Sequence, residues 1–322
     1  MLPKVCVIYD QPSTFVLQDV ELLRRHFEVR PFLYRGRRDL PRLSVALARS
    51  NVGLSWFALG HARAAVTIAP RVRCRTIVIA AGYDVAKVPD VGYGALLGAK
   101  GAKRAKATLQ GADLVLAVSE STRRQVAELT DREVRVVHNA VDTNQFKPGG
   151  QKRRQVLTVA GVDWAGRFKV KRVDIVLDVA RDMRAIQFYL AGKNSAEWSE
   201  RLRASAPDNL GVLGERDERG MVRLYRQSKV YLQPSAHESF GLSVAEAMAC
   251  ECVPVVSDRY ALPEVVGPAG IIVPYGDGPA TIAGVEKALE SDLGRAARRR
   301  VVERFGLERR EAALVRAIES LL

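Results

Sequence analysis

The stretch PSAHESFGLSVAEAMACECVPVVSD, residues 234–258, decides which fold the chain is expected to adopt. A short apolar run at 230–232 precedes it and predicts a buried strand, and the run at 253–257 predicts the next strand. Between them, residues 234–240 have the turn-forming composition of a loop, and residues 242–249 suit a helix. A strand, loop, helix and strand in this order make one βα unit of a parallel sheet.

The same alternation of apolar runs and helical segments extends outward through the whole chain. In the first half, strands are expected at 5–9, 29–33, 52–57, 76–80, 114–118 and 134–137. In the second half, strands are expected at 156–160, 185–191, 210–213, 230–232, 253–257 and 271–273. This pattern predicts an α/β protein whose parallel sheets are covered by helices on both faces.

Residues 138–154, HNAVDTNQFKPGGQKRR, combine turn formers with charges and lack a helical period, which predicts a linker between the two halves. We therefore expect a first domain over 1–148 and a second domain over 149–307. A last helix over 308–322 is expected to pack on the first domain. Three consecutive arginines, Arg298, Arg299 and Arg300, are expected on a solvated helix face.

The composition limits the class of protein. With 322 residues, of which 48% are hydrophobic and 27% charged, the chain can build two domain cores, which excludes global disorder. No stretch approaches the roughly 20 apolar residues of a membrane span, and the start lacks a secretory signal, so a soluble cytoplasmic protein is expected. The four cysteines fit neither a disulfide framework nor a zinc site. The net charge of +14 attracts polyanions, namely nucleic acid, anionic lipid or phosphorylated substrates.

Two glutamates, Glu238 and Glu246, carry the chemistry of the 234–258 stretch. They flank the start of the expected helix, where backbone N–H groups and the helix dipole favour a phosphate. Glu238 can reach hydroxyls on one side of that phosphate and Glu246 hydroxyls on the other, which suggests a diphosphate with a sugar at each end. The residues expected to present backbone amides to the phosphate are Ser239, Phe240, Gly241 and Leu242.

This segment resembles the retaining glycosyltransferases of family 4. Residues 238–249 fit the family pattern E-[GS]-F-G-L-x-x-x-E-A-M-A completely, and the family's P-V-V stretch follows at 254–256. Further resemblances lie at 112–120, at 138–148, at 190–192 and at 262–266. Residues 159–180 look like the family's first C-terminal strand, loop and helix, in which Lys171 and Asp174 match a K-G-x-D-x-x-x-x-A pattern and Ala180 lies one position beyond the pattern's alanine.

The resemblance implies the GT-B architecture, two Rossmann-like domains that face a central cleft. It implies that the second domain binds a nucleotide-diphosphate sugar and the first domain binds the acceptor. In that reading Glu246 holds the ribose hydroxyls, Glu238 holds the donor sugar, and Lys171 stabilises the leaving diphosphate. Lys169 or Arg167 is expected to assist Lys171, and Gly192 to form the turn at the donor site.

Several positions depart from the family pattern. Residues 10–14, DQPST, stand where a Gly-Gly loop is common, Val162 stands in place of an arginine, and Arg172 and Glu251 stand in place of glycines.

The histidine that often follows the fourth strand is also absent, and residues 80–84, AAGYD, occupy its place. Asp84, with Tyr83 beside it, could orient or deprotonate an acceptor hydroxyl, or Asp84 could simply cap the next turn. His237 and His61 are further acceptor-side candidates.

The resemblance, carried by these residues, implies a retaining glycosyltransferase that moves a hexose from a nucleotide diphosphate to a hydroxyl acceptor, either a glycan or a lipid-linked one. No D-x-D stands where it would hold a metal at a strand end, so we expect no metal and no cofactor beyond the donor substrate. Two alternatives stay open: a sugar-nucleotide epimerase or phosphorylase on the same fold, and a basic nucleic-acid-binding protein on a degenerate scaffold. A nicotinamide dehydrogenase is disfavoured because no G-x-G-x-x-G follows the first strand.

Two basic clusters lie in the first half, eight arginines over 24–49 and a second group at Lys100, Lys103, Arg104 and Lys106. Basic amphipathic segments bind anionic membranes, so a peripheral association with the inner membrane face is a second expectation for location. The alternative is ordinary solvated arginine. Nucleic acid is not an expected partner, because basic and aromatic residues do not interleave as in stacking platforms.

Overall fold

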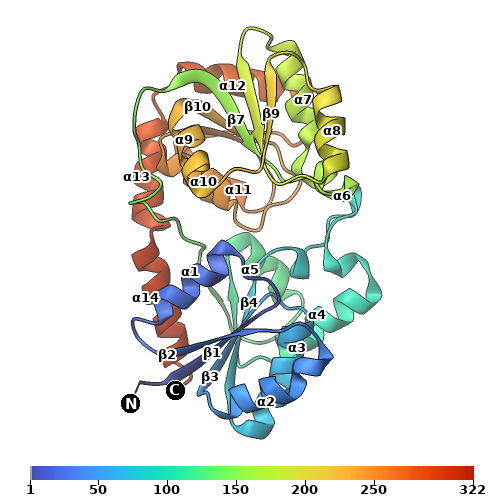
Figure 1. Ribbon diagram of the computed structural model, residues 1–322, viewed down its shortest axis with the longest axis vertical. Coiled ribbons are helices and arrows are strands. Elements are labelled where there is room, and N and C mark those ends of the chain that lie inside the picture. The colour runs from blue at the N-terminus through green and yellow to red at the C-terminus, as the bar shows by residue number, and fades with distance from the viewer. Residues whose placement is uncertain (1) are drawn as a thin grey trace. The chain divides into compact units, whose positions relative to one another are not determined.

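The computed structural model describes residues 2–322 and divides them into two compact units (Figure 1). The first unit comprises the chain up to Ala140 together with Leu307–Leu322, and the second comprises Val141–Gly306. Each unit contains one six-stranded parallel sheet with helices on both faces. Within the described part of the chain, no helix is long and apolar enough to cross a membrane.

The sheet of the first unit has the strand order β2-β1-β3-β4-β5-β6. Its strands are β1 (Lys4–Tyr9), β2 (Glu28–Leu33), β3 (Val52–Trp56), β4 (Arg75–Ala80), β5 (Leu114–Ala117) and β6 (Val134–Val136). Its helices are α1 (Thr14–Leu23), α2 (Leu40–Ala48), α3 (Gly60–Ile68), α4 (Ala99–Gly111), α5 (Glu120–Ala127) and α14 (Leu307–Glu319). The central strands are almost wholly buried, as expected for parallel strands covered on both faces.

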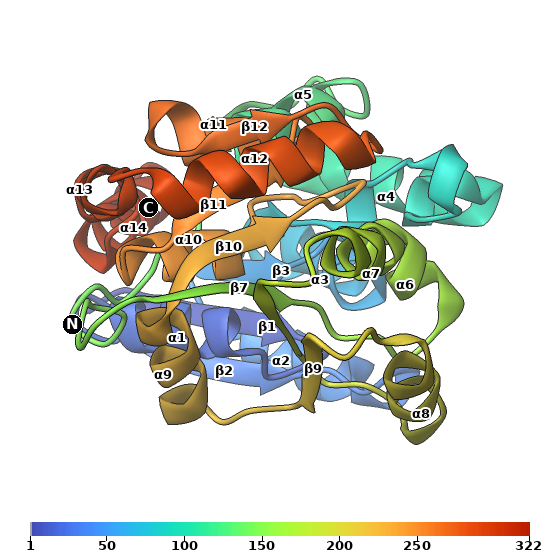
Figure 2. The ribbon, with the colours of Figure 1, turned by 90° about the horizontal axis from the view of Figure 1, so that it is seen from above.

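The sheet of the second unit has the strand order β12-β11-β10-β7-β8-β9. Its strands are β7 (Arg153–Val159), β8 (Gln187–Ala191), β9 (Leu210–Gly214), β10 (Ser228–Gln233), β11 (Val253–Ser257) and β12 (Ile271–Val273). Its helices are α6 (Ala165–Lys171), α7 (Val173–Asp182), α8 (Ala196–Ser205), α9 (Glu218–Gln227), α10 (Leu242–Ala249), α11 (Leu262–Val266), α12 (Gly278–Glu290) and α13 (Gly294–Arg304). Figure 2 shows α12 running along β11, against which it packs.

Every strand expected from the sequence is present, with ends shifted by at most a few residues. The largest shift is at β7, which starts at Arg153 because that residue pairs with Ser228 of β10.

The division between the units also differs from the expected one, since it falls after Ala140 and not at 148. Residues 141–148 pack on the second unit: the Val141 amide donates to the Phe305 carbonyl over 2.8 Å, and the Phe146 ring lies edge-on to Tyr225.

The strand order reverses at one point in each sheet. In the first sheet β1 lies between β2 and β3, and in the second sheet β7 lies between β8 and β10. At such a switch point the loops that leave adjacent strands run in opposite directions and open a crevice at the carboxyl edge, where ligands of parallel sheets bind. The topology therefore selects two regions: the ends of β1 and β3, and the ends of β7 and β10.

Two of the three consecutive arginines of α13, Arg298 and Arg300, do not lie on the solvated face that the sequence suggests. Arg298 donates to the carbonyls of Ala249 over 2.7 Å and of Phe146 over 3.2 Å. Arg300 donates to the carbonyls of Glu264 and Val265 over 2.7 and 2.8 Å, and Arg299 is the exposed member of the three. Guanidinium groups thus satisfy carbonyls at the ends of α10 and α11, which the helices cannot satisfy themselves.

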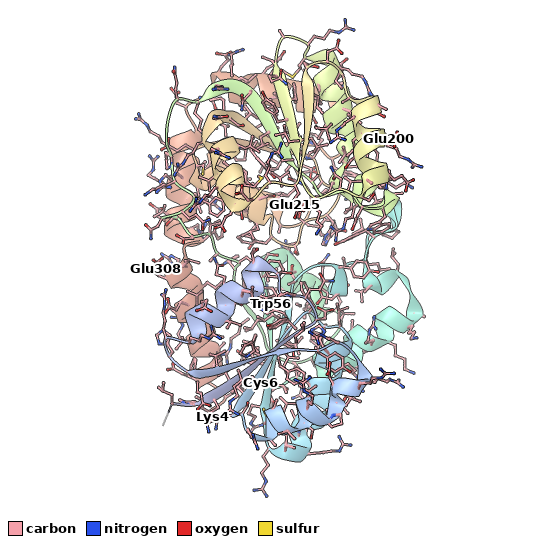
Figure 3. The ribbon with its side chains drawn as sticks, viewed as in Figure 1. Lys4, Cys6, Trp56, Glu200, Glu215 and Glu308 are labelled. Atoms are coloured by element: carbon pink, nitrogen blue, oxygen red, sulfur yellow. The ribbon has the colours of Figure 1, made fainter. Side chains whose placement is uncertain are left out.

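The last helix, α14, lies beside α1 and belongs to the first unit (Figure 1). Its buried Arg310 binds the buried carboxylate of Asp19 through Nε and Nη2, over 2.5 and 2.7 Å. Trp56, labelled in the interior of this unit in Figure 3, donates its indole N–H to the same carboxylate over 3.1 Å. The Arg310 guanidinium also lies 5.2 Å from the Trp56 ring centroid, so one buried ionic network fixes the C-terminal helix.

Candidate functional site

The carboxyl edge of the second sheet brings the predicted donor residues together at the switch point between β7 and β10. Lys171 ends helix α6, which follows β7, and Glu238 lies in the loop after β10. The Lys171 Nζ atom is 2.6 Å from Glu238 Oε1. Two residues that the sequence assigned separately, to the diphosphate and to the donor sugar, are therefore direct partners.

The Glu238 carboxylate is held by three donors that all bind one of its oxygens. Besides Lys171, the Gln233 side-chain amide and the Ser235 hydroxyl donate to Oε1 over 3.1 and 3.0 Å. Among the described residues no donor contacts Oε2, and 15% of the side chain is exposed. Oε2 is consequently the oxygen that can accept a hydrogen bond from a substrate hydroxyl. Gln233 and Ser235 were missed from the sequence, although they lie within five residues of Glu238.

The position of Lys171 depends on an unusual residue behind it. Arg172 adopts the left-handed conformation, with φ 49° and ψ 49°, and separates α6 from α7. A non-glycine residue there costs about 1 kcal/mol, which explains why glycine is expected at this position. Arg172 donates to Asp174 over 2.8–3.1 Å, and its guanidinium lies 5.0 Å from the Tyr275 ring centroid. These contacts offset the backbone cost and hold the turn that presents Lys171.

Glu246 lies on α10, half-buried, and accepts a hydrogen bond from the Tyr225 hydroxyl over 2.8 Å. That bond uses Oε2, so Oε1 is the oxygen that can accept from a ligand. Burial disfavours the charged carboxylate and raises the pKa of Glu246 to about 7, while the hydrogen bond from Tyr225 acts in the opposite direction. Tyr225, on α9, is a second partner that sequence spacing did not indicate.

Helix α10 begins where the sequence places it, at Leu242. Gly241 precedes it with φ 92°, a left-handed conformation that glycine adopts without strain. Ser239 and Leu242 are half-buried, whereas the Phe240 side chain is buried and packs edge-on against Phe305 at 5.3 Å. The Phe240 side chain therefore anchors the loop, and only its backbone could face a ligand.

The turn after β8 requires its glycine. At Gly192, with φ 153°, a Cβ atom would lie 2.1 Å from the Ala160 carbonyl oxygen. Two residues further on, Asn194 accepts a hydrogen bond through Oδ1 from the Val162 amide over 2.8 Å. This bond joins the loop after β7 to the loop after β8. Val162, which stands where the family pattern has an arginine, is fully buried and carries no charge.

The expected helpers of Lys171 are exposed. Arg167 lies 3.2 Å from Asp163, with about half of each side chain exposed, and Lys169 is exposed on the same helix. Neither contacts Lys171 or Glu238 within the described residues.

His237 is not the surface group that an acceptor-side role requires. It is 4% exposed, and its ring lies 4.3 Å from the ring of Tyr260, which has a left-handed φ of 51°. Burial lowers the pKa of His237 to about 4, Glu238 acts against this shift, and Lys171 adds to it. The imidazole is therefore buried and neutral at pH 7.

Asp84 also has a different role from the predicted one. It is fully buried, and its carboxylate accepts from the backbone amides of Ala58 over 2.8 Å and Ala81 over 3.4 Å. Burial raises its pKa to about 6, against the lowering effect of these amides. The carboxylate therefore joins the loops after β3 and β4 and is not exposed to a ligand, and these two contacts are to preceding residues and not to the next turn. Its neighbour Tyr83 is 48% exposed and packs edge-on against Tyr93.

The switch point of the first sheet carries a carboxylate that the sequence analysis noted only as a departure from the family pattern. Asp10 follows β1, and its Oδ2 lies 3.8 Å from Nδ1 of the buried His61, at the start of α3. The Nε2 atom of His61 donates to the Trp56 carbonyl at the end of β3. Burial lowers the pKa of His61, although Asp10 acts against this shift. Asp10, with 39% of its side chain exposed, is the member of the pair that a ligand can reach.

The raised pKa of Glu246 predicts a pH-dependent stability of the second unit. The folded state holds the proton more tightly than the unfolded state, whose carboxyl has a pKa near 4.5. This contribution to stability is complete below about pH 4.5 and is lost as the pH rises toward 7. Glu246→Gln should flatten that decline in urea unfolding followed by Trp164 and Trp198 fluorescence. An unchanged slope in the variant would contradict the raised pKa.

Comparisons with known proteins find relatives of this chain in sequence and in fold. Residues 153–291 match the family model described as glycosyl transferases group 1. An alpha-maltose-1-phosphate synthase of Mycobacterium tuberculosis is 30% identical over 230 residues, which cover 60% of this chain and 59% of the synthase. The chain thus spans less than two thirds of that relative's length.

Two solved structures match over almost the whole chain. The sucrose-phosphate synthase of Thermosynechococcus elongatus has a TM-score of 0.80 at 15% identity and covers 99% of both chains. Anabaena HepE, in complex with UDP and glucose, has a TM-score of 0.77 at 15% identity and covers 99% of this chain and 100% of that one. At this identity the likeness concerns the fold alone, and it confirms the expected GT-B fold class.

Proposed function

We propose that this chain, whose residues 153–291 match the group 1 glycosyl transferases, is an enzyme that transfers a sugar from a nucleotide diphosphate to a hydroxyl acceptor. The observation that carries the proposal is the Lys171–Glu238 pair at the start of α10, with Glu246 further along that helix. A cation, a helix N-terminus and two carboxylates with one available oxygen each match the chemistry of a sugar nucleotide. HepE, which shares the fold, binds UDP and glucose, and this supports a nucleotide sugar as donor.

The proposed donor binding assigns each group a distinct task. The diphosphate lies at the α10 start and competes with Glu238 for Lys171, so that Lys171 neutralises the charge of the leaving group. Glu238 Oε2 accepts from a hydroxyl of the transferred hexose, and Glu246 accepts from the ribose diol. The bond from the anomeric carbon to the diphosphate breaks with its electron pair on the diphosphate, and the acceptor oxygen forms the new bond.

The finer proposal is a retaining, metal-independent reaction of the family 4 type. Retention fits a displacement on the face from which the diphosphate leaves, with the acceptor proton passing to the leaving diphosphate. Such a step uses no enzyme nucleophile, and it leaves Glu238 with Oε1 on Lys171, Gln233 and Ser235 and with Oε2 on a hydroxyl of the hexose. Lys171 and the helix amides supply the positive charge that a metal would otherwise provide.

Thermal melts with uridine, guanosine and adenosine diphosphates and their sugars test the proposal. The wild-type protein should be stabilised by one nucleotide series, because a ligand that binds only the folded state raises its melting temperature. Glu246→Ala should abolish that stabilisation, since the ribose would lose its carboxylate acceptor. The matched control is Glu286→Ala, an exposed glutamate on α12, which should keep the full shift. If every nucleotide shifts the melting temperature of Glu246→Ala as much as that of the wild type, the donor-site assignment is wrong.

On the acceptor side we propose Asp10 as the group that orients the hydroxyl, in place of the buried Asp84. Asp10→Ala should lower transfer about 10- to 100-fold, the effect of losing one hydrogen bond to a charged group. The nucleotide-induced shift in melting temperature should stay, because the donor residues lie on the other unit. Asp131→Ala removes an exposed carboxylate before β6 and should have wild-type transfer. Equal transfer in both variants would refute the role of Asp10.

A lipid-linked acceptor and contact with an anionic membrane belong to the same proposal. The exposed Lys100, Lys103, Arg104 and Lys106 on α4, with the 40%-exposed Leu97 just before that helix, support it. Co-sedimentation measures the membrane contact: the chain should sediment with anionic vesicles and not with neutral ones.

The rival function, an epimerase or phosphorylase on this fold, would consume the sugar nucleotide without a hydroxyl acceptor, which a product analysis detects.

A further inference from the structure

A polar pocket lies at the opposite edge of the second sheet from the donor residues. Its volume is about 380 Å³, and it opens where the segment 141–150 enters β7 and where α9 leads into β10. We call it the amino-edge pocket. Its lining consists of two glycines, two glutamines and four cations, which are Gly149, Gly150, Gln151, Gln227, Lys152, Arg153, Arg223 and Arg226.

The four cations of the amino-edge pocket have no carboxylate partner among residues 2–322, and no carboxylate lines the pocket. Several exposed arginines elsewhere in the chain do pair with a neighbouring carboxylate: Arg123 with Glu120, Arg181 with Asp178, and Arg201 with Glu197. Four like charges around one cavity repel one another, and an anion in the cavity would relieve that repulsion.

Two of the cations are half-buried and fixed by backbone carbonyls. Lys152 Nζ donates to the Tyr225 carbonyl over 2.7 Å, and Arg226 Nε donates to the Lys147 carbonyl over 2.8 Å. Lys152 Nζ also donates to Cys252 Sγ over 3.5 Å. These uncharged partners orient the two side chains without neutralising their charge, so the remaining N–H groups can bind an anion. Arg153 and Arg223 are exposed and can approach an anion from the rim.

The backbone of the amino-edge pocket leaves room for a ligand at Gly150. At Gly150, with φ 73°, an added Cβ would meet no atom within 4 Å, while a Cβ at Gly149 would lie 3.2 Å from Arg226. The seven residues of β7 separate the pocket from the carboxyl edge, a length of roughly 20 Å. The amino-edge pocket is therefore a separate place from the donor site.

We propose that the amino-edge pocket is a binding site for a phosphate-bearing anion with several charges. A compact polyphosphate can accept hydrogen bonds from Lys152 and Arg226 at the base and from Arg153 and Arg223 at the rim. The anion would contact the chain where residues 141–150 enter the second sheet. This inference is independent of the proposed function, because none of the four cations belongs to the donor site.

Calorimetric titration of the full chain with inorganic tripolyphosphate tests the site. The variant Arg153→Ser/Arg223→Ser should bind about tenfold or more weakly, because two charge-assisted contacts are lost while both positions are exposed enough to leave the fold intact. The matched control Arg201→Ser/Arg203→Ser removes the same charge from exposed positions on α8 and should bind within about twofold of the wild type.

The donor site could also take up tripolyphosphate, so the titration is repeated with Lys171→Ala. Binding that persists in Lys171→Ala and weakens in Arg153→Ser/Arg223→Ser supports the amino-edge pocket. Binding that is lost in Lys171→Ala but kept in Arg153→Ser/Arg223→Ser overturns it, as does an equal loss in the α8 control. No detectable binding by the wild type also overturns it.

A second arm distinguishes a soluble phosphate compound from a lipid headgroup. Phosphatidylglycerol vesicles and phosphatidylcholine vesicles are sedimented with the wild type and with both double variants, with and without tripolyphosphate. Binding to the anionic vesicles that tripolyphosphate displaces and that only Arg153→Ser/Arg223→Ser loses assigns the pocket to a lipid phosphate. If tripolyphosphate binds as expected and the three proteins sediment alike, the pocket takes a soluble phosphate compound.

Discussion

Lys171→Ala should reduce sugar transfer by about 10²- to 10³-fold, the loss typical when one group that stabilises a leaving or developing charge is removed. The expectation rests on the 2.6 Å contact between Lys171 and Glu238, which places the cation at the start of α10. Its removal also leaves Glu238 with an uncompensated charge near the diphosphate. Single-turnover measurements with saturating donor separate this loss in rate from any loss of donor affinity.

A double-mutant cycle shows whether the two residues act as a unit. If Lys171 and Glu238 act together, Lys171→Ala/Glu238→Gln should lose less than the sum of the two single changes, because each single change already disables the pair. Lys287→Ala, an exposed lysine on α12, is the matched control and should transfer at the wild-type rate. Wild-type turnover in Lys171→Ala would show that Lys171 does not take part in sugar transfer.

Arg310→Ala should destabilise the first unit by about 3–5 kcal/mol, the cost of removing one partner from a buried ion pair. Asp19 is 0% exposed and would keep only the Trp56 indole N–H as a donor, and the carbonyls of Val137 and His138 would lose the Nη1 donor. The measurement is urea unfolding followed by Trp56 fluorescence in a Trp164→Phe/Trp198→Phe background, in which Trp56 is the only tryptophan.

Two controls separate charge from packing in this network. Arg309→Ala changes an exposed arginine on the same helix and should cost under about 0.5 kcal/mol. Asp19→Leu/Arg310→Met removes both charges together and should recover much of the lost stability, because no uncompensated charge stays buried. A cost for Arg310→Ala as small as that for Arg309→Ala would show that the ionic network does not fix α14.

The sequence by itself determined the twelve strands, the α/β class and the carboxylate pair on either side of the α10 start. These features depend on short-range patterns: apolar runs mark buried strands, and a glycine before a helix marks its start. Glu238, Gly241 and Glu246 lie within one loop and helix, so their spacing along the chain nearly fixes their spacing in space. The expected position of the phosphate follows from the same local spacing and stays a prediction.

The tertiary structure alone decided which distant residues meet. Lys171 and Glu238 are 67 positions apart and meet because β7 and β10 are neighbours in the sheet, an order that local patterns do not encode. Asp84 and Asp10 both follow strands of the first sheet. Asp84 is buried and accepts hydrogen bonds from two backbone amides, whereas Asp10 lies at the switch point with 39% of its side chain exposed. Local sequence predicts which side chains could bind a ligand. Strand order and burial determine which of them can reach it, because they depend on contacts between segments far apart in the chain.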